Sequence, residues 1–418
     1  MGGQRVLREF ALTMSSVASL ASVSVPNESI SRSVSFPDTP SSVLTGAAAV
    51  EVAKELNLPT HAVKPFGESD GVLSAVFVAQ WSEHKRVFVK TPPTHDFLHL
   101  LCREQQLFKR EAACLRQCAA KEAEKCATLY VPHLVRESAS CLAMHHLGDL
   151  GFSNVPEQRT RTVRGSTLRT PLSFEHARQA LTALAEFHAL FFDDESVLSE
   201  FDKLFSEEAH RNFIMSAFDD GVADLKRLER KGVVQADVVA SVEQMRGQFD
   251  EDNAHVPRTC FLIHGDLWSP NLMWRANRVA FVDFQWTKRG EPLHDVYYLL
   301  FSAMETEARR SNFEALLEHY VARLLSLISI EKHKKALQFL RGSEQHARAV
   351  RQTTAQLIAG GCDLFLSVEG EVGHEERTGS ELESRFFAML HDLGKLEQRY
   401  RRYTSDLQTD SDVRSSSC

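Results

Sequence analysis

A single β-like segment, residues 259–286, interrupts a second half of the chain that otherwise has helical periodicity. It contains two apolar runs, FLI and VAFV, and each run stops at polar residues: HGD follows the first run, and DFQ follows the second. An apolar run that stops at a carboxylate places that carboxylate at the end of a strand. The segment therefore predicts a small β-structure that carries polar side chains within a mainly helical domain.

The first part of the chain has a different pattern, with several β-like runs. GVLSAVFVAQW (71–81) and RVFVKTP (86–92) flank SEHK, which predicts a β-hairpin. Helical spacing precedes the hairpin in TGAAAVEVAKEL and follows it as one long helix at residues 94–123, and short strands are expected in TLYVPHLVRES and SCLAMHHL. We expect an α+β N-terminal lobe at residues 46–150 and a larger, mainly helical lobe at residues 151–403.

Composition limits the remaining possibilities. The 418 residues carry a formal net charge of −8, which argues against broad electrostatic capture of nucleic acid. No apolar run approaches the ~18 residues that a membrane span requires. Residues 1–45 are rich in Ser and Val and residues 404–418 are polar, so we expect disordered tails there. A few arginines among residues 1–45 leave an organelle-targeting segment as an alternative interpretation.

The polar residues of the β-like segment form an ordered set. Asp266 follows His264 by two residues, Asn271 comes five residues after Asp266, and Asp283 comes about a dozen residues later. Phosphoryl transfer needs a carboxylate that accepts the proton of the attacking hydroxyl, and a carboxylate and an amide oxygen that bind Mg²⁺. Asp266 is the candidate base, and Asn271 and Asp283 are the candidate metal ligands. The spacing matches that of a kinase catalytic loop, with Gly265 in place of arginine.

The N-terminal lobe supplies candidates for contacts with nucleotide phosphates. Gly71 allows the backbone to turn close to a phosphate, and Ser74 can donate to it. Lys90 ends the strand VFVK, where a kinase places the lysine that contacts the α- and β-phosphates. Glu111 on the following helix is the favoured partner of Lys90, and Glu104 is the alternative.

These motifs carry a family resemblance. HGDLWSPNLMW with VDFQ and PLHDVYYLL, together with LAEFHAL (184–190) and FVKTPP (88–93), resembles the ecdysteroid-kinase-like, or CHK-kinase-like, family. That family is a branch of the choline kinase and aminoglycoside phosphotransferase superfamily. The resemblance covers about residues 60–330. It implies a bilobal protein-kinase-like fold, ATP and Mg²⁺ as cofactors, and a small-molecule hydroxyl as the acceptor.

The same resemblance implies roles for individual residues. It assigns Asp266 as the base, Asn271 and Asp283 as metal ligands, and Lys90 as the contact to the phosphates. Asp295 in LHDVYYLL, like His264, would steady the catalytic loop without contacting the substrate. His188 would be a buried structural residue of the helical lobe.

The hinge between the lobes departs from the family pattern. Met144-His145-His146-Leu147 stands where such kinases usually carry an acidic pair. The adenine contacts of a hinge are mostly made by the backbone, so ATP binding is compatible with this change, but it puts the nucleotide preference in question. The acceptor is not readable from the sequence: sterol-like alcohols, amino alcohols and xenobiotic hydroxyls remain open.

Three alternatives compete with the small-molecule kinase. A phosphohydrolase would use His391 and Asp392 of MLHDLGK as metal ligands, with His374 upstream and an aspartate of the C-terminal tail. A kinase-fold binding module without activity is disfavoured because the base, the metal aspartate and the lysine are all present. A protein kinase is disfavoured because only about seven residues separate Gln285 from Pro292, too few for a long activation loop.

The eight cysteines include no CxxC pair. Cys114 and Cys118 are one helical turn apart and could share a metal. No second close pair or nearby histidine completes such a site, so reduced cysteines within a helix are favoured. The pattern suits a reducing compartment, and we expect a cytoplasmic protein.

Overall fold

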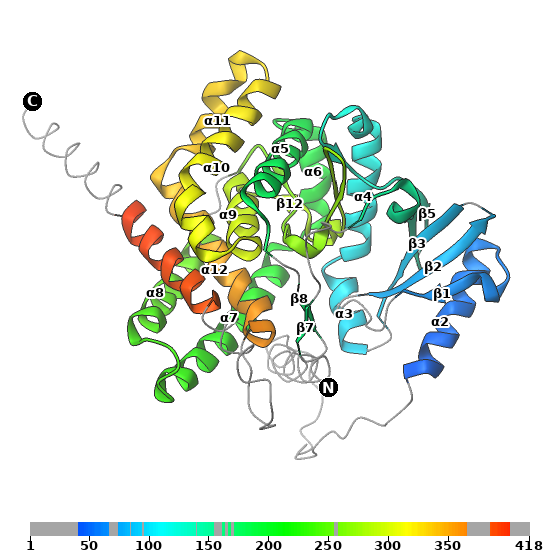
Figure 1. Cartoon of the computed structure of the whole chain (residues 1–418), viewed down its shortest axis with the longest axis horizontal. Helices are drawn as coiled ribbons and strands as arrows, with labels where there is room; N and C mark the ends of the chain where they lie inside the picture. The colour runs from blue at the N-terminus through cyan, green and yellow to red at the C-terminus, as the bar shows by residue number, and fades with distance from the viewer. Residues whose placement is uncertain are drawn as a thin grey trace, which may run out of the picture.

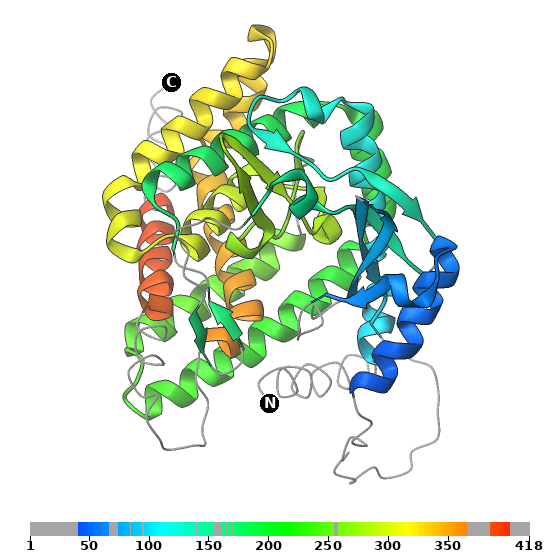
Figure 2. The same cartoon turned by 45° about the vertical axis from the view of Figure 1, so that its right-hand side comes forward.

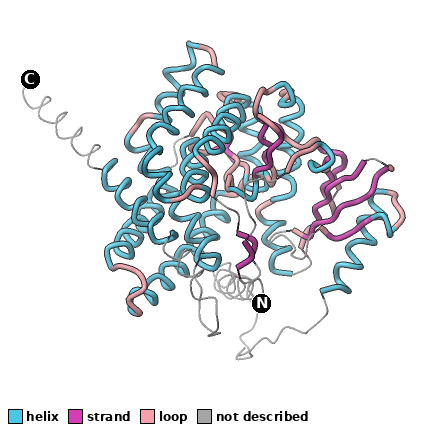
Figure 3. Tube along the Cα trace, in the orientation of Figure 1, coloured by secondary structure: helices cyan, strands magenta, loops and turns pink. Residues whose placement is uncertain are grey.

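The computed structural model describes residues 41–66, 74–83, 85–93, 96–138, 140–153, 161–163, 166–168, 171–254, 258–365 and 385–401. A small β-sheet with its flanking helices lies to one side of a larger body of helices (Figures 1 and 2). Figure 3 shows that the largest sheet belongs to the smaller part, while helices dominate the larger one. This arrangement confirms the expected α+β, bilobal fold.

The sheet of the smaller lobe has five antiparallel strands in the order β1-β2-β3-β6-β5. Their bounds are β1 (Val63–Pro65), β2 (Ala75–Ser82), β3 (Lys85–Thr91), β5 (Leu134–Glu137) and β6 (Leu142–His145). Strands β2 and β3 form the predicted hairpin, in which Val76 pairs with Lys90. Alternate side chains of β2, Phe77 and Ala79 among them, are buried, as expected for a strand with one face on the core.

Helix α2 (Ser41–Leu56) covers one face of this sheet. Val52, Ala53 and Leu56 are buried against Phe77 and Val89 in a separate small core. The helix begins at Ser41, so residues 41–45 of the segment expected to be a tail belong to it. A short 3-10 helix, η1 (Thr60–Ala62), leads from α2 to β1.

The long helix expected at residues 94–123 is interrupted, so that prediction is wrong in its continuity. The chain forms α3 (Asp96–Glu104) and α4 (Leu107–Ala120), and Gln106 between them has a left-handed backbone with φ 51°. A residue in that region cannot continue a right-handed helix. The break lets α4 take its own direction and bury a face that includes Glu111, while Leu101 and Cys102 are buried on α3.

The larger lobe includes helices α5 to α12 and the helix at residues 385–401. The bounds are α5 (Phe174–Phe191), α6 (Glu195–Leu204), α7 (Glu207–Arg230), α8 (Ala236–Ala254), α9 (Pro292–Ala303), α10 (Thr306–Leu327), α11 (His333–Leu340), α12 (Ser343–Phe365) and 385–401. Helix α5 packs along α10, and α12 contacts α7, α8 and α9. Buried side chains from these helices form the main hydrophobic core. Short 3-10 turns η2 (Ala123–Lys125), η3 (Leu147–Leu150) and η6 (Ile330–Lys332) connect neighbouring elements.

The expected β-like segment at residues 259–286 is present and lies next to the smaller lobe. It contains β9 (Leu262–Ile263), η4 (Ser269–Asn271), β10 (Leu272–Arg275), β11 (Arg278–Phe281) and η5 (Phe284–Trp286). Strand β10 pairs with β11, and β9 pairs with β12 (Lys288–Arg289). The short strands β7 (Arg161–Val163) and β8 (Ser166–Leu168) pair with each other.

Strand β4 (Leu129–Tyr130) joins this segment rather than the N-terminal sheet. It pairs in parallel with β11, where Val279 lies opposite Leu129. A stretch that the sequence assigns to the first lobe thus completes a three-stranded sheet with the second. Within the described ranges, no helix is long and apolar enough to cross a membrane.

Candidate active site

The loop after β9 carries Asp266, and its backbone requires a glycine. Gly265 has φ 81°, in the left-handed region that other residues rarely adopt. A Cβ atom added to Gly265 would lie 2.4 Å from the carbonyl oxygen of Trp286, which is too close for any side chain. The glycine therefore lets the loop approach the segment that follows Asp283.

Asp295 of α9 holds this loop through hydrogen bonds to its backbone. The backbone N–H groups of His264 and Gly265 donate to its two carboxylate oxygens, at 2.7 and 2.9 Å. His188 Nε2 lies 3.2 Å from the same carboxylate, and His188 Nδ1 lies 2.6 Å from the Tyr320 hydroxyl. Burial alone would raise the pKa of Asp295, but the hydrogen bond and charge of His188 hold that pKa below its ordinary value. Asp295 and His188 are fully buried.

Asp266 and Asn271 lie next to each other. Asn271 Nδ2 donates to the backbone carbonyl of Asp266 at 2.8 Å and reaches its Oδ2 at 3.4 Å. His264 Nε2 donates to the carbonyl of Val282 at 3.0 Å, which ties the loop to the end of β11. Burial and the nearby charge of Asp283 raise the pKa of Asp266 to about 7. These contacts hold the residues of the loop together.

Asp283 stands where β11 ends, with a left-handed backbone at φ 68°. Its Oδ1 accepts from Lys90 Nζ at 2.6 Å, and Lys90 also donates to both oxygens of Glu111 at 3.0 Å. The lysine of β3 therefore bridges the carboxylate of α4 and the carboxylate after β11. Burial would lower the pKa of Lys90, but the charges of Asp283 and Glu111 outweigh burial and raise it, so the ammonium stays charged.

The other phosphate-contact candidates have different positions. The pairing expected between Glu111 and Lys90 is present, whereas Glu104 is exposed at the end of α3, beyond the break in the helix. Ser74 is buried just before β2, whose residue Val76 pairs with Lys90. Gly71 lies outside the described residues.

Two residues of this site are not among the predicted ones. Gln356 of α12 donates from Nε2 to the carbonyl of Gly265 at 2.9 Å and to Asp266 Oδ1 at 3.1 Å. Tyr298 of α9 is hydrogen-bonded to Asp266 as well. Tyr298 follows Asp295 by three residues and so shares its helix face, a signal that the sequence does contain. No local pattern marks Gln356.

The hinge contains a histidine pair, His145 and His146, followed by the acidic Asp149. His145 ends β6, and His146 Nδ1 lies 3.1 Å from Asp149 in η3. Asp149 also accepts from the backbone N–H of Arg86 at 2.9 Å and from its Nε at 2.8 Å. Burial lowers the pKa of His145. An acidic residue is therefore present a few positions after the histidine pair, and it binds Arg86 on β3.

The HDLGK motif is engaged in a structural contact. Asp392 accepts from Arg309 at 2.6 Å and from Arg310 on both oxygens at 2.9 to 3.1 Å. A carboxylate whose two oxygens are held by guanidinium groups is poorly placed to bind a metal. His391 is partly exposed beside it, and His374 lies outside the described residues.

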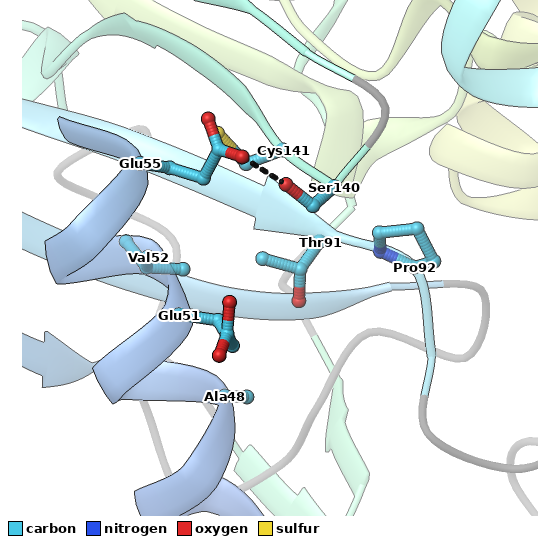
Figure 4. A pocket seen from close by; sticks show the side chains of 8 residues that line it. All are labelled: Ala48, Glu51, Val52, Glu55, Thr91, Pro92, Ser140 and Cys141. Atoms are coloured by element: carbon cyan, nitrogen blue, oxygen red, sulfur yellow. Dashed lines mark hydrogen bonds between the residues drawn. The ribbon is translucent and has the colours of Figure 1, made fainter.

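A cavity of about 170 Å³ lies elsewhere in the smaller lobe, between α2 and the ends of β3 and β6 (Figure 4). Its lining includes Glu51, Glu55, Thr91, Ser140 and Cys141, and Ser140 donates to Glu55 across it at 2.9 Å. None of the predicted catalytic residues lines this cavity.

The small antiparallel sheet, the bridged lysine and the loop that carries Asp266 together define a protein-kinase-like fold. The profile of the ecdysteroid kinase-like family matches residues 76–332, more than half of the chain. The chain belongs to the ecdysteroid kinase-like family.

Comparison with curated proteins finds a kinase-like protein of Caenorhabditis elegans, described as uncharacterised, that is 25% identical over 155 residues. The match covers 34% of this chain and 39% of that protein, so the chain spans about two fifths of the length of this curated relative.

Comparison with solved structures finds several small-molecule kinases. An ADP-bound aminoglycoside phosphotransferase is 17% identical, with 82% of this chain and 98% of that chain covered and a TM-score of 0.38. The Plasmodium vivax ethanolamine kinase is 10% identical, with 78% and 82% covered and a TM-score of 0.44. An amicoumacin kinase in complex with AMP-PNP is 10% identical, with 83% and 95% covered and a TM-score of 0.47.

Proposed function

We propose that this protein is an ATP- and Mg²⁺-dependent kinase that transfers the γ-phosphoryl group to a hydroxyl of a small molecule. The observation that carries the proposal is the position of Lys90, which bridges Glu111 and Asp283 at 2.6 to 3.0 Å. This bridge joins the nucleotide-covering lobe to the end of β11. Phosphoryl transfer depends on such positioning and on charge neutralisation more than on covalent chemistry.

Asp266 is the residue that would accept the proton of the acceptor hydroxyl. The acceptor oxygen forms a bond to the γ-phosphorus, the bond from that phosphorus to the β,γ-bridging oxygen breaks, and ADP leaves. The carboxylate is held on one side by Asn271 and on the other by Gln356, which limits its motion. Its orientation is thus fixed before a substrate arrives.

The residues present fit a Mg²⁺ ion that is shared with the nucleotide. Asp283 offers a carboxylate and Asn271 an amide oxygen, since Nδ2 of Asn271 is used by the backbone of Asp266. Within the described ranges, no group of three His, Cys, Asp or Glu residues gathers in a metal-binding arrangement. Mg²⁺ commonly binds through one or two protein oxygens and completes its shell with substrate phosphates and water. When bound, the ion would neutralise charge on the β- and γ-phosphates.

Lys90 and Ser74 are the proposed contacts to the phosphates, with Gly71 assigned to the same loop from the sequence alone. The Lys90 ammonium stays charged and is already oriented by Glu111. Glu111 therefore acts as a positioning residue for Lys90. His264 and Asp295 would position the catalytic loop through the backbone contacts described above.

The proposed acceptor is a sterol-like alcohol, an amino alcohol or a xenobiotic hydroxyl. A library of such compounds incubated with γ-labelled ATP tests the proposal, with the Asp266→Asn variant as the blank. We expect labelled product from the wild type and none from the variant. Equal labelling by both proteins would overturn the assignment of Asp266, and His391→Ala is the variant that a phosphohydrolase would require to be inactive.

We also propose a cytoplasmic location. The free cysteines of the described residues include Cys114 and Cys118, which are buried in α4. Unpaired buried thiols are typical of proteins that function in a reducing compartment. Microscopy of a fluorescent fusion tests this, and an organellar signal would contradict it.

A further inference from the structure

A second group of basic side chains lies outside the proposed active site, where α4 meets the α6–α7 junction and the η5–β12 segment. It consists of Arg110, His210 and Lys288, with two aromatic rings between them. The Arg110 guanidinium lies 5.4 Å from the ring centre of Phe205 and 5.5 Å from that of Trp286. Lys288 Nζ lies 2.8 Å from His210 Nε2 and 5.0 Å from the centre of Phe205. We call these three basic residues the basic cluster.

The basic cluster presents hydrogen-bond donors without acceptors. Arg110 is fully buried, and its Nε, Nη1 and Nη2 have no hydrogen-bond partner in the part of the chain that the structure describes. A charged Lys288 ammonium has no acceptor and must donate to His210 Nε2. In that state the ring proton of His210 is on Nδ1. That Nδ1 is also buried and has no partner among the described residues. A buried arginine without an acceptor is costly, because it loses its hydration and gains no hydrogen bond in exchange.

Carboxylates do not balance this charge. Among the described residues, no ion pair joins Arg110 or Lys288 to an acidic side chain, and the nearby Asp295 is already bound to His264 and His188. Burial lowers the pKa of Arg110 to about 9, and burial with the charge of Arg110 lowers the pKa of Lys288 to about 7. At Lys288 the charges of Asp295 and Glu207 act in the opposite direction but do not outweigh burial and the charge of Arg110.

We propose that Arg110, His210 and Lys288 bind an oxyanion of the phosphate class. A guanidinium and an ammonium lie against the same Phe205 ring, with the His210 imidazole beside the ammonium, and an anion with several oxygens and more than one negative charge can accept from several such donors. Phe205, His210, Trp286 and Lys288 are only partly buried, so the basic cluster extends from the buried Arg110 to residues that contact solvent. A single carboxylate would leave donors of this set unused.

The basic cluster is close in the chain to residues of the proposed active site, so an anion bound there would affect that site. Arg110 directly precedes Glu111, which holds Lys90, and Trp286 and Lys288 follow Asp283 closely in the chain. A bound oxyanion would therefore join α4 to the segment after β11, the two elements that Lys90 bridges. Occupancy would stabilise the arrangement of the lobes, which makes the basic cluster a regulatory anion site. Binding itself does not depend on the proposed kinase activity.

Thermal unfolding and calorimetric titration with inorganic phosphate test the inference without nucleotide. Sodium chloride at equal ionic strength is the reference, because phosphate also stabilises proteins non-specifically. Lys288→Gln is the test variant, and Lys109→Gln is its matched control, since Lys109 is exposed on α4, next to Arg110, and the change removes one charge as well. Lys90→Gln shows whether phosphate binds instead at the nucleotide site.

We expect phosphate to raise the melting temperature of the wild type, Lys109→Gln and Lys90→Gln, and we expect this rise to be lost in Lys288→Gln. Arg110→Met should lose the rise too and, because it removes an unpaired buried charge, should not destabilise the phosphate-free protein. If Arg110→Met does not fold, the effect of phosphate on the melting temperature of Lys288→Gln tests the proposal by itself. No phosphate effect in the wild type, or an equal effect in Lys288→Gln, would overturn the proposal.

Two sources could supply the same group: free phosphate and a small phosphate monoester. Titration with inorganic phosphate and with phosphoethanolamine separates them, since only a site open enough for a substituent accepts the ester. Binding of either at a dissociation constant that rises at least tenfold in Lys288→Gln supports the site. If Lys288→Gln binds both phosphate and phosphoethanolamine as tightly as the wild type does, the proposed site is refuted.

Discussion

Asp295 offers the most direct test of how the catalytic loop is held. Replacing it with asparagine keeps the shape of the side chain but turns one acceptor oxygen into a donor. The carboxylate now accepts from the N–H groups of His264 and Gly265 and from His188 Nε2. The new amide cannot satisfy both backbone donors, so at least one of them stays buried without a partner.

The size of the effect follows from these contacts. A hydrogen bond to a charged group contributes about 1.5–3 kcal/mol, and a buried donor that loses its acceptor costs about 1–3 kcal/mol. Asp295 is fully buried, so solvent does not weaken either contribution. We therefore expect Asp295→Asn to lower the free energy of unfolding by about 3–5 kcal/mol. Phosphoryl transfer should fall as well, because small displacements of a reacting group can cost about 10²-fold in rate.

Glu186→Gln is a matched control for this variant. Glu186 is a buried carboxylate of α5 that accepts from the backbone N–H groups of Thr128 and Leu129, at 2.9 and 2.7 Å, and from Arg323. It stabilises β4 rather than the catalytic loop. Urea unfolding should show a comparable loss for both variants, whereas transfer assays at a temperature where both stay folded should show a catalytic loss only for Asp295→Asn.

The pH dependence of the free energy of unfolding provides a second test of the contacts that Asp295 makes. The pKa of Asp295 is lower in the folded protein than the ~3.9 of an unfolded chain, so its stabilisation is present above that value and is lost as the pH falls through the folded pKa. The stability difference between wild type and Asp295→Asn should be constant from about pH 5 to 8 and shrink in more acidic solution. A stability loss below about 1 kcal/mol, smaller than one charged hydrogen bond, would refute the reasoning.

Three further predictions follow from the site. Gln356→Leu should lower kcat about 10- to 100-fold without changing the calorimetric Kd for MgATP, since it removes two hydrogen bonds to the catalytic loop, and an unchanged kcat would contradict this. Gly265→Ala should cost at least about 2 kcal/mol in urea unfolding through its contact with Trp286, whereas the exposed helical Gly247→Ala should stabilise by about 0.5–1 kcal/mol. Glu111→Gln should raise the Kd for MgATP, and a Kd equal to that of the wild type would refute its role in orienting the lysine.

The local part of this structure could be predicted from the sequence because it depends on neighbours in the chain. The β2–β3 hairpin follows from two alternating runs around a short turn, and Lys90 is placed by its position at the end of β3. The β-like segment around Asp266 and Asp283 likewise follows from apolar runs that stop at polar residues. Short-range periodicity was sufficient for these elements.

The remaining features depend on contacts between distant residues. The break at Gln106 has no glycine or proline to mark it, because the packing of α4 rather than local preference sets that backbone conformation. The parallel pairing of Leu129 with Val279 joins segments that lie far apart in the chain. Gln356 reaches Asp266 from α12, about ninety residues later, and no spacing rule indicates such a contact.

The central claim is that Asp266 and Asp283 have different tasks in one phosphoryl transfer. The most direct measurement pairs MgATP binding with transfer of label from γ-labelled ATP for Asp266→Asn and Asp283→Asn. We predict that both variants lose transfer, that Asp266→Asn still binds MgATP, and that Asp283→Asn binds it more weakly. Transfer at the wild-type rate by the Asp283 variant would contradict this account of the site.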